Sequence, residues 1–170
     1  MPKLSGNKGE WSEIYAFLRL LEIKKLYAAD AELNKKDDMF YNIINIIRTE
    51  PIGTLEFRIN KVEDTVSVVK TDTENILITL PCNEFKTAAD NLYNEIISAN
   101  KSSFESQDTE GFLEQLNIGV LKAKSTDKAD IRIKIHDINT GYETVQGFSI
   151  KSRLGSSSTL VNAGKTTNFV

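Results

Sequence analysis

The chain has 170 residues, 40% of them hydrophobic and 26% charged, which is the composition of an ordinary soluble domain and a length that hardly accommodates two. No apolar run approaches the roughly 18 residues that span a bilayer, and the N-terminus has no apolar signal core, so we expect a cytoplasmic protein. A single cysteine, Cys82, and a single histidine, His136, exclude an internal disulfide, a Cys-based zinc site and a paired-histidine metal site. Carboxylates and lysines must therefore carry any chemistry.

The net charge of −3 is unevenly distributed. Residues 117–170 carry eight Lys or Arg and four Asp or Glu, a balance of +4, which leaves 13 basic and 20 acidic residues, a balance of −7, in residues 1–116. A basic end on an acidic protein suggests a surface that faces a polyanion such as nucleic acid. Ordinary solvated strand faces would give the same balance, so composition leaves both interpretations open.

Residues 1–116 are predicted to form an N-terminal helical and β-meander region. Apolar residues at three- and four-residue spacing predict a helix over 8–26, and a second apolar run predicts a helix over 38–48 that Glu50-Pro51 would end. Period-two alternation over 54–59, 65–69 and 75–80 predicts an antiparallel meander. Helices over 83–99 and 112–116 complete this region.

Residues 117–170 differ in character, and we treat them as a second region that holds the core hairpin. A strand is expected over 118–121. Strict alternation over 130–137 predicts a strand, residues 139–141 a turn, and residues 143–151 the returning strand. Residues 153–168 are polar and small and predict a loop and a helix. The whole pattern indicates an α/β (α+β) fold.

The predicted hairpin brings two ionisable residues together. Asp130 opens its first strand and Lys151 closes its second, so antiparallel pairing puts both at one end of the sheet. A carboxylate there suits a hard cation such as Mg²⁺, which activates water for attack on a phosphate. A nearby lysine orients that water or stabilises the developing charge. The plainer interpretation is a strand-start acid and an edge-strand lysine.

Longer runs around these two residues carry a family resemblance. They are Lys122-Ala-Lys-Ser-Thr-Asp-Lys-Ala-Asp130-Ile, Gly147-Phe-Ser-Ile-Lys151-Ser-Arg-Leu-Gly-Ser, Thr159-Leu-Val-Asn162-Ala and, near the N-terminus, Asn7-Lys8-Gly9-Glu10-Trp11-Ser12-Glu13. The series resembles the HpaII-type family of type II restriction endonucleases, within the PD-(D/E)xK nuclease superfamily. This resemblance implies a nuclease-like mixed sheet flanked by helices, Mg²⁺-dependent hydrolysis of double-stranded DNA at CCGG, and a cognate DNA methyltransferase.

The resemblance also implies roles for single residues. Asp130 would ligate the metal, and Lys151 would activate water. Ser149 stands where the superfamily usually has Asp or Glu, so another carboxylate must supply the second metal ligand. Glu13 is the best candidate, because its setting resembles a helix that lends an acid to this site in related nucleases, and Glu10, one turn away, is the alternative. Both acids also fit the plain preference for carboxylates at a helix start.

DNA contacts are expected from the residues around and after Lys151, namely Ser149, Ser152, Arg153, Ser156 and Asn162. Restriction of a palindrome further implies two active sites, in a homodimer or in sequential binding events. By resemblance, family members are considerably longer, so we expect this chain to be an N-terminal portion, incomplete at its C-terminus and weakly active or inactive alone. Two other functions stay open: a different PD-(D/E)xK nuclease of DNA repair or recombination, and a catalytically silent DNA-binding domain.

Overall fold

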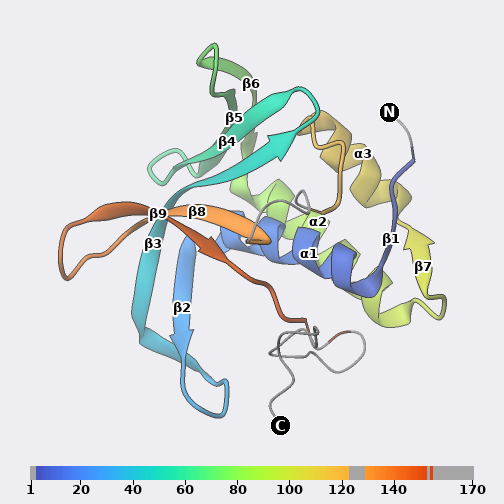
Figure 1. Cartoon of the computed structure of the whole chain (residues 1–170), viewed down its shortest axis with the longest axis horizontal. Helices are drawn as coiled ribbons and strands as arrows, with labels where there is room; N and C mark the ends of the chain where they lie inside the picture. The colour runs from blue at the N-terminus through green and yellow to red at the C-terminus, as the bar shows by residue number, and fades with distance from the viewer. Residues whose placement is uncertain (1–2, 123–128, 153, 155–170) are drawn as a thin grey trace, which may run out of the picture.

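The computed structural model describes residues 3–122, 129–152 and 154, and within them an antiparallel sheet packs one face against two helices (Figure 1). The strands of the seven-stranded sheet follow the order β6-β5-β4-β3-β8-β9, and β2 also pairs with β3. The expected α+β class is confirmed. The helices are α1 (Lys8–Ile23), α2 (Cys82–Ser98) and α3 (Gln107–Gln115). The strands are β1 (Ser5–Asn7), β2 (Lys25–Ala29), β3 (Lys35–Glu50), β4 (Gly53–Asn60), β5 (Thr65–Lys70), β6 (Asn75–Pro81), β7 (Ser103–Glu105), β8 (Ile131–His136) and β9 (Glu143–Phe148).

Helix α1 begins where the sequence predicts and ends three residues earlier. Asn7 caps it by accepting a hydrogen bond from the backbone N–H of Glu10 over 3.0 Å, and the Glu10 carboxylate accepts one from the Asn7 N–H over 2.9 Å. At the other end Lys24 adopts the left-handed conformation with φ of 62°, and its N–H donates to the Leu20 carbonyl. The helix predicted over 8–26 was therefore too long, because this cap turns the chain into β2.

The predicted helix over 38–48 is wrong, because these residues lie in the long central strand β3. Its isoleucines are β-branched, and the strand pairs with β4 on one edge and with β8 on the other. A register shift between Ile43 and Asn45 adds a residue to the strand, so the buried Ile43 and Ile46 are three positions apart. Because of this bulge, the buried apolar residues of the strand have the three-residue spacing that is typical of a helix.

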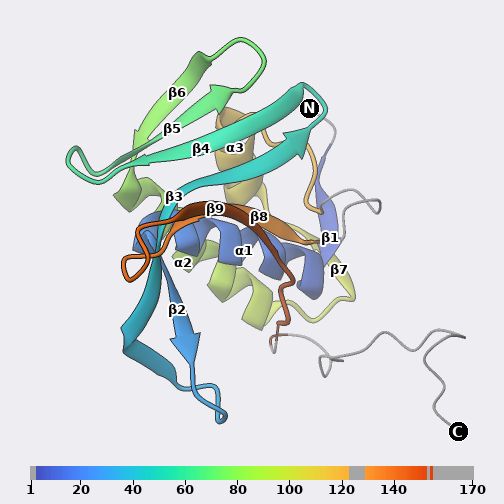
Figure 2. The same ribbon diagram turned by 60° about the vertical axis from the view of Figure 1, so that its left-hand side comes forward.

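The meander and the hairpin were predicted correctly. Strands β4, β5 and β6 pair in succession, and β8 pairs with β9 from Ile131↔Phe148 to His136↔Glu143. Strand β9 ends at Phe148, three residues before its predicted end. Helix α2 confirms the expected helix, whereas α3 starts five residues before the one predicted. Figure 2 shows the helices gathered on one face of the sheet. The buried side chains of Phe17, Phe57, Phe85 and Leu92 belong to one hydrophobic core cluster.

Residues 118–121 form no strand, which corrects that expectation. The Ile118 N–H instead donates to the Leu113 carbonyl at the end of α3, and the backbone of Gly119 and Val120 bonds to side chains of β3. The expected loop and helix over 153–168 lie outside the described residues except at Leu154. No helix in the described part of the chain is long and apolar enough to cross a membrane.

Candidate active site

The hairpin holds Asp130 against the residue that precedes Lys151. The Asp130 N–H donates to the Phe148 carbonyl over 3.0 Å, and the Ile150 N–H donates to Asp130 Oδ2 over 2.7 Å. These two bonds continue the pairing of β8 with β9 past the end of the strands. They fix the Asp130 carboxylate against the backbone of Ile150, the residue before the exposed Lys151.

Glu13 reaches the same place from the first half of α1. Its Oε2 atom is buried and has no hydrogen-bond partner in the described structure. Burial first, and then the negative charge of Asp130, raise the pKa of Glu13 from 4.5 to about 7, while the positive charge of Lys122 opposes this rise. Glu13 and Asp130 are thus close enough to repel each other, although α1 and β8 lie more than one hundred residues apart in the chain.

Two converging carboxylates, one with an unpartnered buried oxygen, are a donor set that fits a hard divalent cation. Such a cation would satisfy the orphaned Glu13 oxygen and remove the repulsion between the two acids. The third predicted ligand, Glu10, is engaged elsewhere, because its carboxylate closes the cap of α1. Among the described residues no three His, Cys, Asp or Glu side chains gather as a metal site. Of the three predicted ligands, Asp130 and Glu13 are the two that this arrangement leaves available to a metal.

Ser152, predicted to contact DNA, has partners inside the protein. Its hydroxyl donates to Ser12 Oγ over 2.9 Å and accepts the Leu154 N–H over 3.0 Å. Ser12 is buried and in turn donates to the Lys8 carbonyl. Ser149 is exposed beyond the end of β9, where a ligand could reach it. Three further predicted contacts, Arg153, Ser156 and Asn162, lie outside the described residues.

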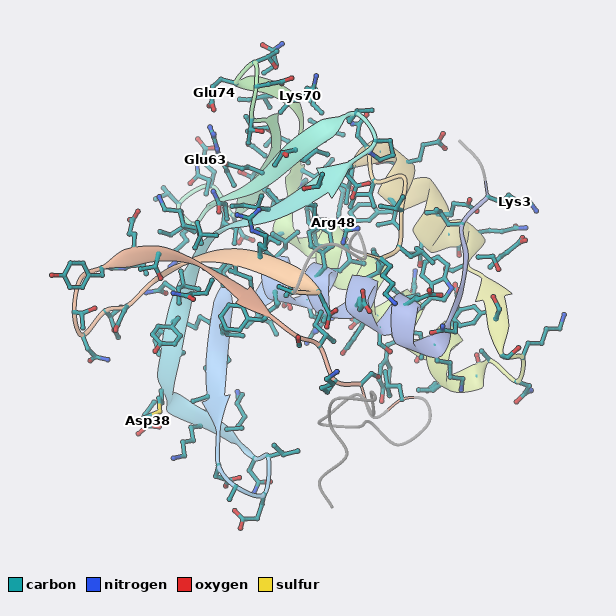
Figure 3. All side chains as sticks on the ribbon, in the orientation of Figure 1. Lys3, Asp38, Arg48, Glu63, Lys70 and Glu74 are labelled. Carbon is teal, nitrogen blue, oxygen red and sulfur yellow. The ribbon has the colours of Figure 1, made fainter. Side chains whose placement is uncertain are left out.

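A buried ion pair beside the site escaped the sequence analysis. Arg48 Nε donates to Glu50 Oε1 over 2.8 Å, and its Nη2 donates to the Val120 carbonyl over 2.8 Å. The other Glu50 oxygen accepts the Gly119 N–H over 2.9 Å. The side chain of Arg48 is 10% exposed and that of Glu50 is fully buried. Figure 3 shows Arg48 between the sheet and the segment that leads to Lys122.

This pair fastens the segment 118–122 to the edge of the site, and the Arg48 charge also lowers the pKa of Glu13. A small cavity of about 20 Å³, room for one water molecule, is lined by Arg48 and Thr49 of β3 and by Asp130. In the sequence, Arg48 and Glu50 directly follow an apolar run, which could have indicated a charged pair next to the core. Because residues 38–48 were interpreted as a helix, the pair was not recognised.

Comparison with known proteins bears on this site. A family model described as HpaII restriction endonuclease matches residues 7–170. Over 173 residues the chain is 38% identical to the type II restriction enzyme HpaII of Haemophilus parainfluenzae, an alignment that covers 97% of this chain and 45% of that enzyme. The chain thus spans about half the length of the curated relative. No solved structure matches it.

Proposed function

Because the chain belongs to the HpaII restriction endonuclease family, we propose that it carries the catalytic centre of a type II restriction endonuclease that cuts double-stranded DNA at CCGG with Mg²⁺. The observation that carries this proposal is the convergence of Glu13 and Asp130 at the end of the hairpin that leads to Lys151. The named activity of the relative from Haemophilus parainfluenzae supports the reaction class.

In this mechanism Asp130 and Glu13 would hold the cation, and Lys151 would act on the attacking water. Bound Mg²⁺ supplies Lewis acidity toward the scissile phosphate. The hydrogen bond from the Ile150 N–H holds the Asp130 carboxylate in a fixed orientation. The carboxylate therefore does not have to reorient during the reaction. Lys151 donates hydrogen bonds that orient a water for in-line attack on phosphorus and stabilise the charge that develops there. The water oxygen bonds to phosphorus as the bond to the leaving oxygen breaks, in a single step without a covalent enzyme intermediate. The proton that the water loses passes to solvent, and the leaving oxygen takes a proton from solvent.

The family suggests the surroundings of this reaction. A palindromic target calls for two active sites, which a homodimer would supply. A cognate DNA methyltransferase would protect the host DNA, and both enzymes would work in the cytoplasm. Exposed Ser149 is the described candidate for a DNA contact near Lys151, and Arg153, Ser156 and Asn162 complete the predicted set.

One observation favours a second function, a DNA-binding domain without catalysis. Ser149 replaces the acid that the PD-(D/E)xK pattern usually has two residues before its lysine, and a neutral hydroxyl is a poor ligand for a hard cation. Such a domain would bind DNA with a steep salt dependence and would not cut it.

The test is cleavage of a plasmid with mapped CCGG sites, with and without Mg²⁺, together with a CpG-methylated copy. The relative from Haemophilus parainfluenzae serves as the positive control. Discrete fragments that map to CCGG and require the metal would support the endonuclease. Binding of the same DNA without cleavage in any metal, both by the chain as given and by a form extended at its C-terminus, would support the silent domain instead.

A further inference from the structure

Strand β2 and the first half of β3 form a two-stranded ribbon, residues 25–42, that extends from the body of the molecule. Both views show it reaching away from the helices, and Asp38 lies toward its outer part (Figures 1, 2 and 3). Residues 35–39 of β3 are exposed, so the protein core does not account for this extension. A projecting β-ribbon has the dimensions of an element that lies along or in a groove of duplex DNA.

One face of the ribbon carries lysines over aromatic rings. Cross-strand partners share a face, and the register pairs Lys25 with Asn42 and Tyr27 with Phe40. The ammonium of Lys25 lies 4.0 Å from the centre of the Phe40 ring, and that of Lys35 lies 4.5 Å from the centre of the Tyr27 ring. Cation–π contacts position an ammonium group without neutralising it.

This face is the side of the sheet away from the helices. Ile43 is buried against the helical layer, so its neighbour Asn42 points the other way, and Lys25 and Phe40 point with it. Asn42 also pairs with His136 on β8. From His136 the same face of β8 continues through Lys134 and Arg132 toward Asp130. Six residues of strand span about 20 Å, so the ribbon root lies roughly six base-pair steps from the candidate active site.

A cluster of positive charge occupies the root of the ribbon. Lys61, from the turn between β4 and β5, donates to Asn42 Oδ1 over 2.8 Å and thereby lies beside Lys25. Partial burial lowers the pKa of Lys61, and the neighbouring charges of Lys25 and Lys24 lower it further. Lys24 is paired with Asp64, and Lys35 with Asp37. Within the described structure neither Lys25 nor Lys61 has a carboxylate partner, so both charges are available to an outside anion.

We propose that Lys25 and Lys61 bind phosphates of the DNA backbone, with the ribbon following the duplex beyond the cleavage site. Duplex DNA as the ligand rests on the proposed function, whereas the position of these contacts follows from the ribbon itself. Lysine contacts to phosphate carry no base information, so they would anchor and orient the duplex whatever its sequence.

The experiment measures binding of the chain to a 20-base-pair duplex over a range of salt concentrations. It uses one duplex with a central CCGG and one without, in Ca²⁺ to prevent cutting. A plot of log K against log[salt] has a negative slope. In the variant with Lys25→Gln and Lys61→Gln this slope should become shallower by about two, one for each lost phosphate contact. Affinity should fall by the same factor for both duplexes. A variant with Lys25→Arg and Lys61→Arg should keep the slope, because it keeps the charges.

A matched control removes two exposed lysines on or just after α2, by Lys86→Gln and Lys101→Gln, and changes the net charge equally. Equal slopes for the parent and the Lys25/Lys61 double variant would overturn the proposal, as would a control variant that loses the same slope. Absence of DNA binding by the parent chain would overturn it too. A slope reduced as expected in Ca²⁺, together with no cleavage when Mg²⁺ replaces Ca²⁺, would support the ribbon contacts while contradicting the proposed endonuclease activity.

Discussion

Ser152 Oγ donates a hydrogen bond to Ser12 Oγ over 2.9 Å, joining two residues that are 140 positions apart. Ser12 precedes Glu13 on α1, and Ser152 follows Lys151. The bond therefore links the helix that supplies one candidate acid to the segment that supplies the candidate lysine.

Ser12→Ala and Ser152→Ala should each destabilise the fold by about 1 kcal/mol, the usual net value of one hydrogen bond. In the double variant the loss should be less than additive, since both changes break the same bond. Urea unfolding of the four proteins measures this coupling. If the enzyme cuts DNA, each change should lower kcat more than it raises KM. Fully additive losses would show that the bond contributes nothing.

Glu13 should make stability fall as pH rises through the range from 4.5 to about 7, where its raised pKa lies. A carboxyl with a higher pKa in the folded state binds more protons folded than unfolded, so its stabilising effect is complete below pH 4.5 and is lost above pH 7. Glu13→Gln should then be the more stable protein at pH 8 by on the order of 1–2 kcal/mol after allowance for solvent screening, and not at pH 4. The charged groups around Glu13 are Asp130, Lys122, Glu10 and Arg48.

Urea unfolding of both proteins at the two pH values is the measurement. Mg²⁺ should stabilise the parent at pH 8 and leave Glu13→Gln unchanged, because binding to the folded state alone raises its stability. A constant difference between the two proteins across pH would contradict the raised pKa.

Asp130→Asn and Lys151→Gln, introduced into a full-length form of the protein, should each abolish DNA cleavage while largely sparing DNA binding. The first removes a ligand charge, and the second removes the group that orients water. Asp137→Asn, at the turn end of the same hairpin, is the control and should cut normally. Cleavage assays with gel-shift binding distinguish the two effects, and retained cutting by either variant would refute the assigned role.

Arg48→Met should destabilise the protein by about 3–5 kcal/mol, because it leaves the buried charge of Glu50 unpaired. The double variant with Arg48→Met and Glu50→Gln should recover much of that loss. Arg58→Met, which breaks two ion pairs, with Glu56 and Glu74, of an arginine that is 41% exposed, should cost under about 1 kcal/mol. Thermal or urea unfolding tests the ranking, and equal losses at both arginines would contradict it.

Gly147→Ala should disturb the hairpin beside Asp130. A Cβ at this position would lie 2.7 Å from the Cβ of Ala129, so the strands would have to separate. We expect a loss of about 1–3 kcal/mol. Gly111→Ala is the contrasting control, since nothing lies within 4 Å of its added Cβ, and it should stabilise α3 by up to about 1 kcal/mol. A neutral Gly147→Ala variant would show that the hairpin end is looser than this packing indicates.

Local patterns predicted a large part of the fold. Strands β4, β5 and β8 alternate in sequence because one face of each is buried, and that alternation needs no distant partner to be recognised. For strand β3 the local pattern led to a wrong prediction, because the bulge near Asn45 places Ile43 and Ile46 at a helical spacing. Its burial depends on β4 and β8, which lie far along the chain.

The sequence by itself determined the hairpin that brings Asp130 to Lys151, because antiparallel pairing over a short turn is local, and its motifs determined the family. The tertiary structure decided which other groups join them. Whether Glu13 faces Asp130, whether Ser152 bonds to Ser12 and whether Arg48 is buried against Glu50 depend on how α1 and the segment 118–122 pack on the sheet. Packing is set by the summed burial of the core and not by any one stretch of sequence.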